Sequence, residues 1–256
     1  MNKKAKVITG VIVAIILVIM GYFMFSKKDD GPSYTITNDS LKFKEEYEGL
    51  NGKDNGNGKN YLSIDIKSYN PISYSNYEEI FDILDKGTGV IYLGFPECPW
   101  CRNLVPVLVD SALEEKVSPI YYLNISGDRN TLSLTKKGKI KTEKKGTEDY
   151  LKLVDILKDY LPVYDGLKDD SIKRIYLPTV IFVKDGKVLG LEETLESYSK
   201  RVDGNPYLEM NDSEKEELSN IFKGYYAKLK KGWLLSVFFL LKENFFTSSS
   251  FFYPKF

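Results

Sequence analysis

The stretch GVIYLGFPECPWC, residues 89–101, places an apolar run just before the only two cysteines of this 256-residue chain, Cys98 and Cys101. The apolar run, residues 89–95, has the character of a β-strand. Two thiols at this spacing on the first turn of a helix can close a small ring reversibly, and a helix N-terminus favours the negative charge of a thiolate. The stretch therefore predicts a strand, a helix and a dithiol/disulfide switch between them.

Zinc ligation and a structural disulfide are the other uses of such a cysteine pair. A zinc site needs a full set of nitrogen or sulfur ligands, which a chain with two cysteines and no histidine cannot supply alone. A disulfide that spans so few residues removes little chain entropy, so it stabilises a fold less than a long bridge does. Redox chemistry is the favoured interpretation, with an inert disulfide or a remnant site as alternatives, and we expect no metal and no organic cofactor.

The charge balance argues against one class of partner. Lysine plus arginine and aspartate plus glutamate number 36 each, so the formal net charge is zero. The chain has no overall basic field and no recognisable nucleic-acid-binding motif. We therefore expect no nucleic-acid partner.

An uncharged apolar run, VITGVIVAIILVIMGYFMF, occupies residues 7–25 behind three lysines. At about 1.5 Å per residue it nearly spans a bilayer core of about 30 Å. The run is longer than the apolar region of a cleaved secretory signal, and no small-x-small cleavage site follows it, so we predict an uncleaved transmembrane signal anchor. Residues 1–6 would be a short cytoplasmic tail, and the large C-terminal domain would lie outside the cytoplasm at the cell membrane, where disulfides persist.

Strand and helix patterns alternate after a polar tether at residues 26–40. Strands are expected at residues 61–66, 89–95, 120–125, 179–183 and 188–190, and helices at residues 77–84, after Cys101, at residues 148–161 and from Ser213. This alternation indicates an α/β layered fold. Ser213 and Glu216 would form a capping box for the last helix, and the domain, residues 41–231, would end near Lys231.

Residues 126–173 interrupt this pattern and are predicted to form an inserted subdomain. A lysine-rich hairpin, centred on residues 136–139, precedes the helix at residues 148–161, and a solvated loop is the favoured interpretation of these lysines. An acidic partner or anionic lipid headgroups are the alternatives. The hairpin is therefore expected to be exposed.

The last segment, residues 232–256, differs in composition from the rest of the chain. It carries seven of the fourteen phenylalanines, and its apolar core, residues 233–241, is too short to span a membrane. An interfacial amphiphilic segment and a translated reading-frame error are both open interpretations.

Two prolines accompany the cysteine motif. Pro106, five residues beyond Cys101, lies inside a helical pattern, where it removes one hydrogen bond and introduces a kink. Leu177-Pro178 stands directly before the apolar run that begins at Thr179, residues 179–183.

The C-P-W-C motif, Pro106 and Pro178 together resemble the thioredoxin superfamily. Its members carry a proline at the same offset in the active-site helix and place a cis-proline opposite the motif, at the start of a strand that ends in a glycine turn. The resemblance covers residues 90–188 and implies a thioredoxin-like fold, a central mixed sheet flanked by helices. With its insertion and anchor, the chain is similar to membrane-tethered thioredoxin-like proteins of bacteria, including bacteriocin-transport accessory proteins.

The resemblance implies a role for each cysteine. Cys98, the exposed one, would attack as a thiolate and form a mixed disulfide, and the more buried Cys101 would resolve it. A Cys98–Cys101 disulfide would then be the redox-active group.

Four neighbouring residues would form the substrate-binding surface. Pro178 would be cis, and Leu177 would offer backbone groups to an extended substrate segment, while Pro99 and Trp100 would form the lip around the attacking thiol. An ordinary trans proline is the alternative for Pro178. Trp100 alone could also be a packing aromatic.

The chain departs from the family pattern in ways that bear on the direction of electron flow. Tyr92 stands where reducing thioredoxins carry a buried aspartate, and no histidine lies between the cysteines, where oxidising relatives often have one. Arg102 would lower the pKa of the thiols and Glu97 would raise it. The direction of electron flow stays open on these residues.

The leading hypothesis is a membrane-anchored, extracytoplasmic thiol-disulfide oxidoreductase that acts on cysteines of exported proteins or peptides and exchanges electrons with an unidentified redox partner. The alternatives are a non-enzymatic accessory or binding module for peptide export or immunity, and a redox sensor. The fold alone does not separate these classes.

Overall fold

The computed structural model describes residues 34–247. The predicted cytoplasmic tail, the signal anchor and most of the tether lie outside these residues, as do residues 248–256. Among the helices that are described, none combines the length and the apolar character needed to cross a membrane.

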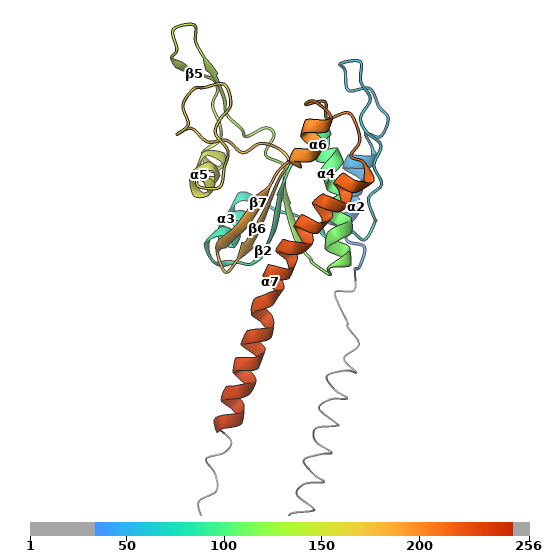
Figure 1. The fold of residues 1–256 in the computed structure, drawn as a ribbon, viewed down its shortest axis with the longest axis vertical. Coiled ribbons are helices and arrows are strands. Elements are labelled where there is room, and N and C mark those ends of the chain that lie inside the picture. The colour runs from blue at the N-terminus through green and yellow to red at the C-terminus, as the bar shows by residue number, and fades with distance from the viewer. Residues whose placement is uncertain (1–33, 248–256) are drawn as a thin grey trace, which may run out of the picture. The chain divides into compact units, whose positions relative to one another are not determined.

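Helices and strands alternate along the described chain (Figure 1). In order they are α2 (Asn38–Glu48), β1 (Ile72–Tyr74), α3 (Tyr77–Lys86), β2 (Gly89–Leu93), α4 (Pro99–Glu114), β3 (Ile120–Leu123), β4 (Thr131–Leu134), β5 (Ile140–Lys144), α5 (Glu148–Leu157), β6 (Thr179–Lys184), β7 (Lys187–Glu192), α6 (Glu196–Arg201) and α7 (Asp212–Thr247). The α/β expectation is confirmed.

Five of the strands form one mixed sheet in the order β1-β3-β2-β6-β7. β1, β3 and β2 run parallel, while β6 is antiparallel to β2 and β7 is antiparallel to β6. Figure 1 shows α3 on one side of this sheet and α4 with α7 on the other. The sheet is therefore covered on both faces, which explains why its central strands are apolar without alternation.

The two central strands, β2 and β6, form the middle of the core. Residues 90–93 of β2 are all buried, and so are residues 179–183 of β6. The register sets Ile91 opposite Ile181, so the two apolar runs lie side by side. Because β2 leads directly into the cysteine motif, the most buried part of the molecule positions the dithiol.

Helix α4 begins where the cysteine motif predicts. Cys98 is its N-cap, with extended backbone, and Pro99 occupies the first helical position, where a missing N–H costs nothing. Pro106 lies inside the helix, as expected. The strand, the turn and the helix around the two cysteines are thus encoded locally.

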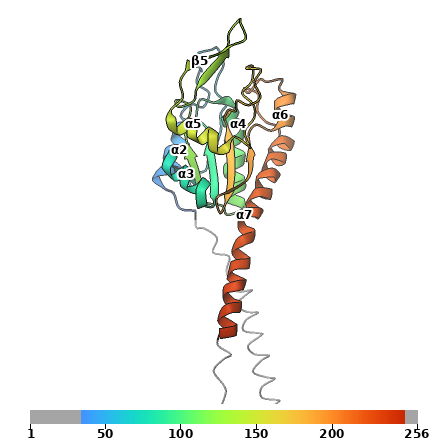
Figure 2. The ribbon, with the colours of Figure 1, turned by 90° about the vertical axis from the view of Figure 1, so that its left-hand side faces the viewer.

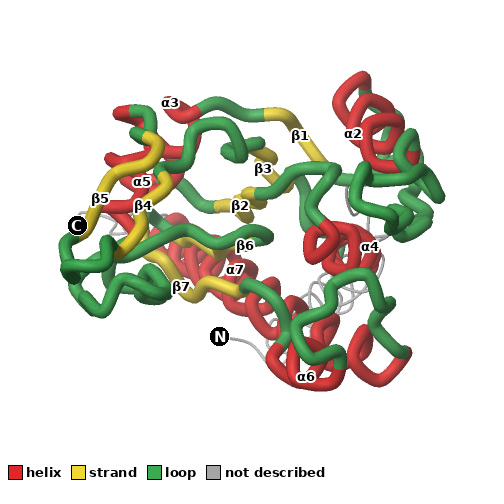
Figure 3. Tube along the Cα trace, turned by 90° about the horizontal axis from the view of Figure 1, so that it is seen from above, coloured by secondary structure: helices red, strands yellow, loops and turns green. Residues whose placement is uncertain are grey.

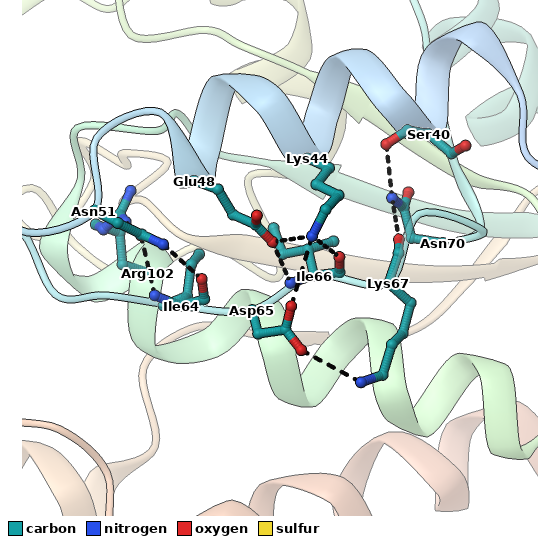
Figure 4. A network of polar contacts seen from close by, with 10 residues as sticks. All are labelled: Ser40, Lys44, Glu48, Asn51, Ile64, Asp65, Ile66, Lys67, Asn70 and Arg102. Atoms are coloured by element: carbon teal, nitrogen blue, oxygen red, sulfur yellow. Dashed lines mark hydrogen bonds and ion pairs between the residues drawn. The ribbon is translucent and has the colours of Figure 1, made fainter.

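Residues 61–66 do not form the predicted strand, although the segment is extended. Side chains supply the partners that a neighbouring strand would otherwise provide (Figure 4). Asn51 bonds both the N–H and the carbonyl of Ile64, at 3.0 and 2.8 Å, and Glu48 accepts the N–H of Ile66 at 2.7 Å. The alternating pattern identified a half-buried segment, but α2 and the turn after it satisfy its backbone.

Three other features differ from expectation. β1 and α6 were not predicted, since both are short and carry little periodic signal. The capping box of α7 is formed by Asn211 and Glu214 in place of Ser213 and Glu216, with bonds of 2.9 Å in each direction. Helix α7 also continues past Lys231 to Thr247.

The predicted insertion contributes one element to the main core. Its hairpin, β4 with β5, forms a separate two-stranded sheet, and the lysines of the hairpin are exposed, as predicted. Helix α5 instead buries Tyr150, Leu153 and Leu157 in the same cluster as the central strands. Figure 2 shows the hairpin projecting beyond α5. The insertion is therefore anchored to the sheet through α5.

Arg102 ties α4 to the irregular segment and to α2. It is fully buried, and its guanidinium donates to the carbonyls of Leu62 and Tyr47 at 2.8 Å each, to that of Pro96 at 3.2 Å and to Asn51 Oδ1 at 2.6 Å. Figure 4 shows Arg102 and Asn51 side by side at one end of this network.

The variant Arg102→Leu is expected to lower the free energy of unfolding by about 3 kcal/mol, because buried carbonyls would lose their donors. Denaturant-induced unfolding measures the change. The exposed Lys141→Leu on the hairpin is the control and should alter stability by no more than about 0.5 kcal/mol. Equal effects of the two substitutions would contradict the assigned role of Arg102.

Candidate dithiol active site

Both cysteines lie at the N-terminus of α4, and both are free thiols in the structure. The sulfur of Cys98 accepts the backbone N–H of Cys101 at 3.2 Å, in the manner of an N-cap side chain. Cys101 is fully buried. The arrangement brings the two thiols together on one helical turn.

Cys98 was predicted to be exposed, but only 4% of its surface is accessible. The cover comes from the segment before β6, where the carbonyl of Leu177 accepts a hydrogen bond from the Cys98 thiol at 3.5 Å. Leu177 is itself only 9% exposed. A reacting partner must therefore displace or join this contact to reach the sulfur.

The Leu177–Pro178 peptide bond is cis, as predicted. Figure 3 looks down on the region where β6 begins close to the start of α4. The structure thus brings Leu177 and Pro178 to the dithiol, as the resemblance implied. The second cis bond in the described chain, Ser118–Pro119, was not predicted.

Pro99 and Trp100 lie between the two cysteines and are half-buried. Trp100 packs edge-on against Tyr198 of α6, with ring centroids 5.5 Å apart. The indole is therefore a packing aromatic, and part of its surface stays exposed.

The two thiols differ in acidity. Burial raises the pKa of the Cys98 thiol, but the hydrogen bond from the Cys101 thiol, the backbone N–H groups of Cys101 and Trp100 and the charge of Arg129 outweigh it, so the pKa lies below its ordinary value. Burial, together with the hydrogen bond and the negative charge of Cys98, raises the pKa of Cys101 well above its ordinary value. Cys98 is thus the sulfur that ionises first.

Arg102 does not have the role expected of it. The Arg102 guanidinium is committed to the carbonyl network described above, and the positive charge that lowers the pKa of Cys98 belongs to Arg129. Arg129 lies in the predicted insertion, 31 residues further along the chain than Cys98 by their numbers. No local motif marks it, so sequence reasoning missed it.

Tyr92, at the position where reducing thioredoxins carry a buried aspartate, belongs to a buried group of tyrosines beneath Cys101. Its hydroxyl shares a hydrogen bond of 2.7 Å with that of Tyr47, and its ring stacks on Tyr122 at 5.4 Å. Burial raises the pKa of Tyr92 well above its ordinary value, so it stays protonated, and its hydrogen bond lowers the pKa of Cys101. Tyr92 therefore acts on Cys101 as a hydrogen-bond donor where a carboxylate would act as a base.

No cluster of histidine, cysteine, aspartate and glutamate able to hold a metal ion occurs within residues 34–247. The chemistry that the site offers is that of two sulfurs with opposite shifts of pKa. Comparisons with protein-family models and with curated proteins gave no match.

Alkylation of Cys98 by iodoacetamide should reach half its maximal rate at a pH below about 8.5, the ordinary pKa of a cysteine. The reason is that a lowered pKa raises the thiolate fraction at each pH below that value. Mass spectrometry after timed alkylation identifies the modified cysteine and gives the rate, and Cys101 should stay unmodified over the same period.

The chain unfolded in denaturant is the internal control, since both thiols should then titrate near the ordinary value. A folded-state midpoint for Cys98 at or above that of the unfolded chain would show that the environment at the N-terminus of α4 does not favour its thiolate.

Proposed function

We propose that the chain is a membrane-anchored, extracytoplasmic thiol-disulfide oxidoreductase with a thioredoxin-like fold. The observation that carries the proposal is the Cys98 sulfur, with its lowered pKa, at the N-terminus of α4 and 3.5 Å from the carbonyl that precedes cis-Pro178. The strand order β1-β3-β2-β6-β7, with β6 and β7 antiparallel, supports the fold assignment.

The first step of exchange is an attack by the Cys98 thiolate on a substrate disulfide. One sulfur–sulfur bond of the substrate breaks, a bond from Cys98 to the nearer sulfur forms, and the other substrate sulfur leaves as a thiolate and takes up a proton. A lowered pKa supplies the thiolate, and the backbone N–H of Cys101 is already directed at its sulfur. The product is a mixed disulfide.

Resolution requires Cys101 to lose its proton and attack Cys98. The Cys98–Cys101 bond forms, the mixed disulfide breaks, and the substrate departs as a dithiol, so two electrons pass from the protein to the substrate. Formation of the mixed disulfide removes the negative charge of Cys98 and its hydrogen bond from Cys101, two of the causes that raise the pKa of Cys101. The Tyr92 hydroxyl stabilises the thiolate as it forms. The reverse sequence oxidises a substrate dithiol.

The substrates would be cysteine-containing exported proteins or peptides that come close to the membrane surface. The apolar run at residues 7–25 would hold the domain at that surface, and a second, unidentified redox protein would restore the starting state of the dithiol. The likeness to bacteriocin-transport accessory proteins favours peptide substrates that are themselves exported.

The variant Cys101→Ser should accumulate a mixed disulfide through Cys98 when incubated with a disulfide-containing peptide, because the resolving thiol is absent. Non-reducing gels and mass spectrometry detect the adduct and locate it. The matched variant Cys98→Ser retains only the buried thiol with the raised pKa and should form at least about tenfold less adduct.

Failure of Cys101→Ser to trap any adduct, with no exchange by the unaltered chain, would rule out the enzymatic proposal. A binding module on the same scaffold would then be favoured if both cysteine variants kept the biological activity.

A further inference from the structure

Two arginines near the dithiol have no acidic partner. Arg129 lies in the loop before β4, and Arg174 stands three residues before Leu177. Both side chains are half-buried, yet among the described residues neither guanidinium forms a hydrogen bond or an ion pair, and the Nε atom of each is buried without a partner. Buried guanidinium groups normally pair with an anion, so we expect a negatively charged ligand to bind at these two arginines.

The two arginines act on each other through their charges, and Arg129 also acts on the dithiol. Burial and then the positive charge of Arg174 lower the pKa of Arg129, and the charge of Arg129 in turn acts on the Cys98 sulfur. Two like charges held together in a partly dry site repel each other unless an anion lies between them. Arg174 stands three residues before Leu177, whose carbonyl contacts the Cys98 sulfur at 3.5 Å, so the repulsion lies near the attacking sulfur.

Aromatic rings hold Arg174 in place without using its donors. Its guanidinium carbon lies 4.3 Å from the centre of the Tyr164 ring and 5.6 Å from that of Tyr176. Such cation–π contacts fix the plane of the group while its N–H bonds stay available. The side chain is therefore positioned to bind a ligand.

Tyr150 adds a third donor. The residue is fully buried in α5, and its hydroxyl makes no hydrogen bond of good geometry with any described residue, although the backbone amide of Ile175 lies close by. Burial raises the pKa of Tyr150, while the charges of Arg174 and Arg129 oppose that rise. The ring also lies beside the backbone next to Arg129, since a Cβ added at Gly146 would meet Tyr150 Cδ1 at 3.0 Å and the Asn130 nitrogen at 3.1 Å. Two cations and one neutral donor therefore converge.

We propose that Arg129, Arg174 and Tyr150 form a carboxylate-binding subsite beside Cys98, which takes an acidic group next to the reacting disulfide of the substrate. The fork of N–H donors on a guanidinium matches the two oxygens of a carboxylate. The subsite specifies the substrate class for the proposed function and rests on it, but its affinity for anions is testable without any exchange reaction.

The direct test compares two alkylating agents that differ in charge, iodoacetate and iodoacetamide, on the full chain. In each reaction the Cys98 thiolate forms a carbon–sulfur bond and iodide leaves. Both rates contain the same thiolate fraction, so their ratio cancels any change in the pKa of Cys98. The ratio of iodoacetate to iodoacetamide should be about tenfold higher for folded protein than for the unfolded chain.

The double variant Arg129→Gln with Arg174→Gln should bring the ratio down to the value of the unfolded chain, and Tyr150→Phe should lower it in part. The matched control is Lys136→Gln with Lys137→Gln, which removes the same charge from the exposed hairpin and should leave the ratio unchanged. A folded wild-type ratio no higher than the unfolded one would overturn the subsite, whatever the variants do. An equal fall of the ratio in the hairpin variant would show that the effect depends on the overall charge of the protein and would also overturn the subsite.

The second test uses disulfide-linked peptides that differ only in glutamate or glutamine beside the cysteine. Exchange should be about tenfold faster with glutamate in the wild type and equal for the two peptides in the arginine double variant. Exchange at equal rates in the wild type would sink the subsite and leave the proposed function standing, whereas no exchange with either peptide would sink the proposed function. A preference for oxidised glutathione over both peptides would identify the carboxylates of a small acidic thiol as the ligand in place of a peptide side chain.

Discussion

The backbone N–H groups in the first turn of α4 have no partners within the helix, and the Cys98 sulfur takes one of them, that of Cys101, at 3.2 Å. This contact lowers the pKa of one thiol and, by placing a negative charge beside its neighbour, raises that of the other. The sheet fixes the contact from one side, since β2 leads directly into the turn. On the other side, the carbonyl of Leu177 accepts a hydrogen bond from the Cys98 thiol. The reactivity of the dithiol thus depends on how firmly the end of α4 is held.

Arg102 explains how that end is held in a chain without a regular strand at residues 61–66. One buried guanidinium joins α2, the turn before α4 and the extended segment, and it adds to the bonds that Asn51 and Glu48 make to that segment. The Arg102 guanidinium donates its hydrogen bonds to carbonyls in these segments. The positive charge that lowers the pKa of Cys98 is that of Arg129. Arg102 therefore supports the structure, while Arg129 affects the acidity of the Cys98 thiol.

Features with a local signal could be predicted from the sequence. The apolar run of β2, proline at the first position of α4 and proline before β6 each determine the backbone around them, and the structure has all three where expected. Burial of Cys98 could not be predicted, because its cover comes from Leu177, 79 residues away. Arg129 and Arg174 carry no signal individually, since only the folding of the insertion brings them together.

Tyrosine at position 92 changes the chemistry available to the second cysteine. A hydroxyl with a raised pKa donates a hydrogen bond to the Cys101 thiolate but does not remove its proton, so deprotonation of Cys101 depends on loss of the charge on Cys98. In the proposed exchange, resolution would therefore be coupled to formation of the mixed disulfide. The same coupling favours the reduced form, in which the Cys98 thiolate is stabilised.

The reduction potential of the Cys98–Cys101 couple, measured by equilibration with glutathione buffers, tests the central claim most directly. Stabilisation of the Cys98 thiolate predicts a reversible couple between about −270 mV and about −120 mV, the range of catalytic dithiols. A potential below about −300 mV, as in structural disulfides, or failure to form the disulfide at all, would contradict a dithiol that exchanges electrons with substrates.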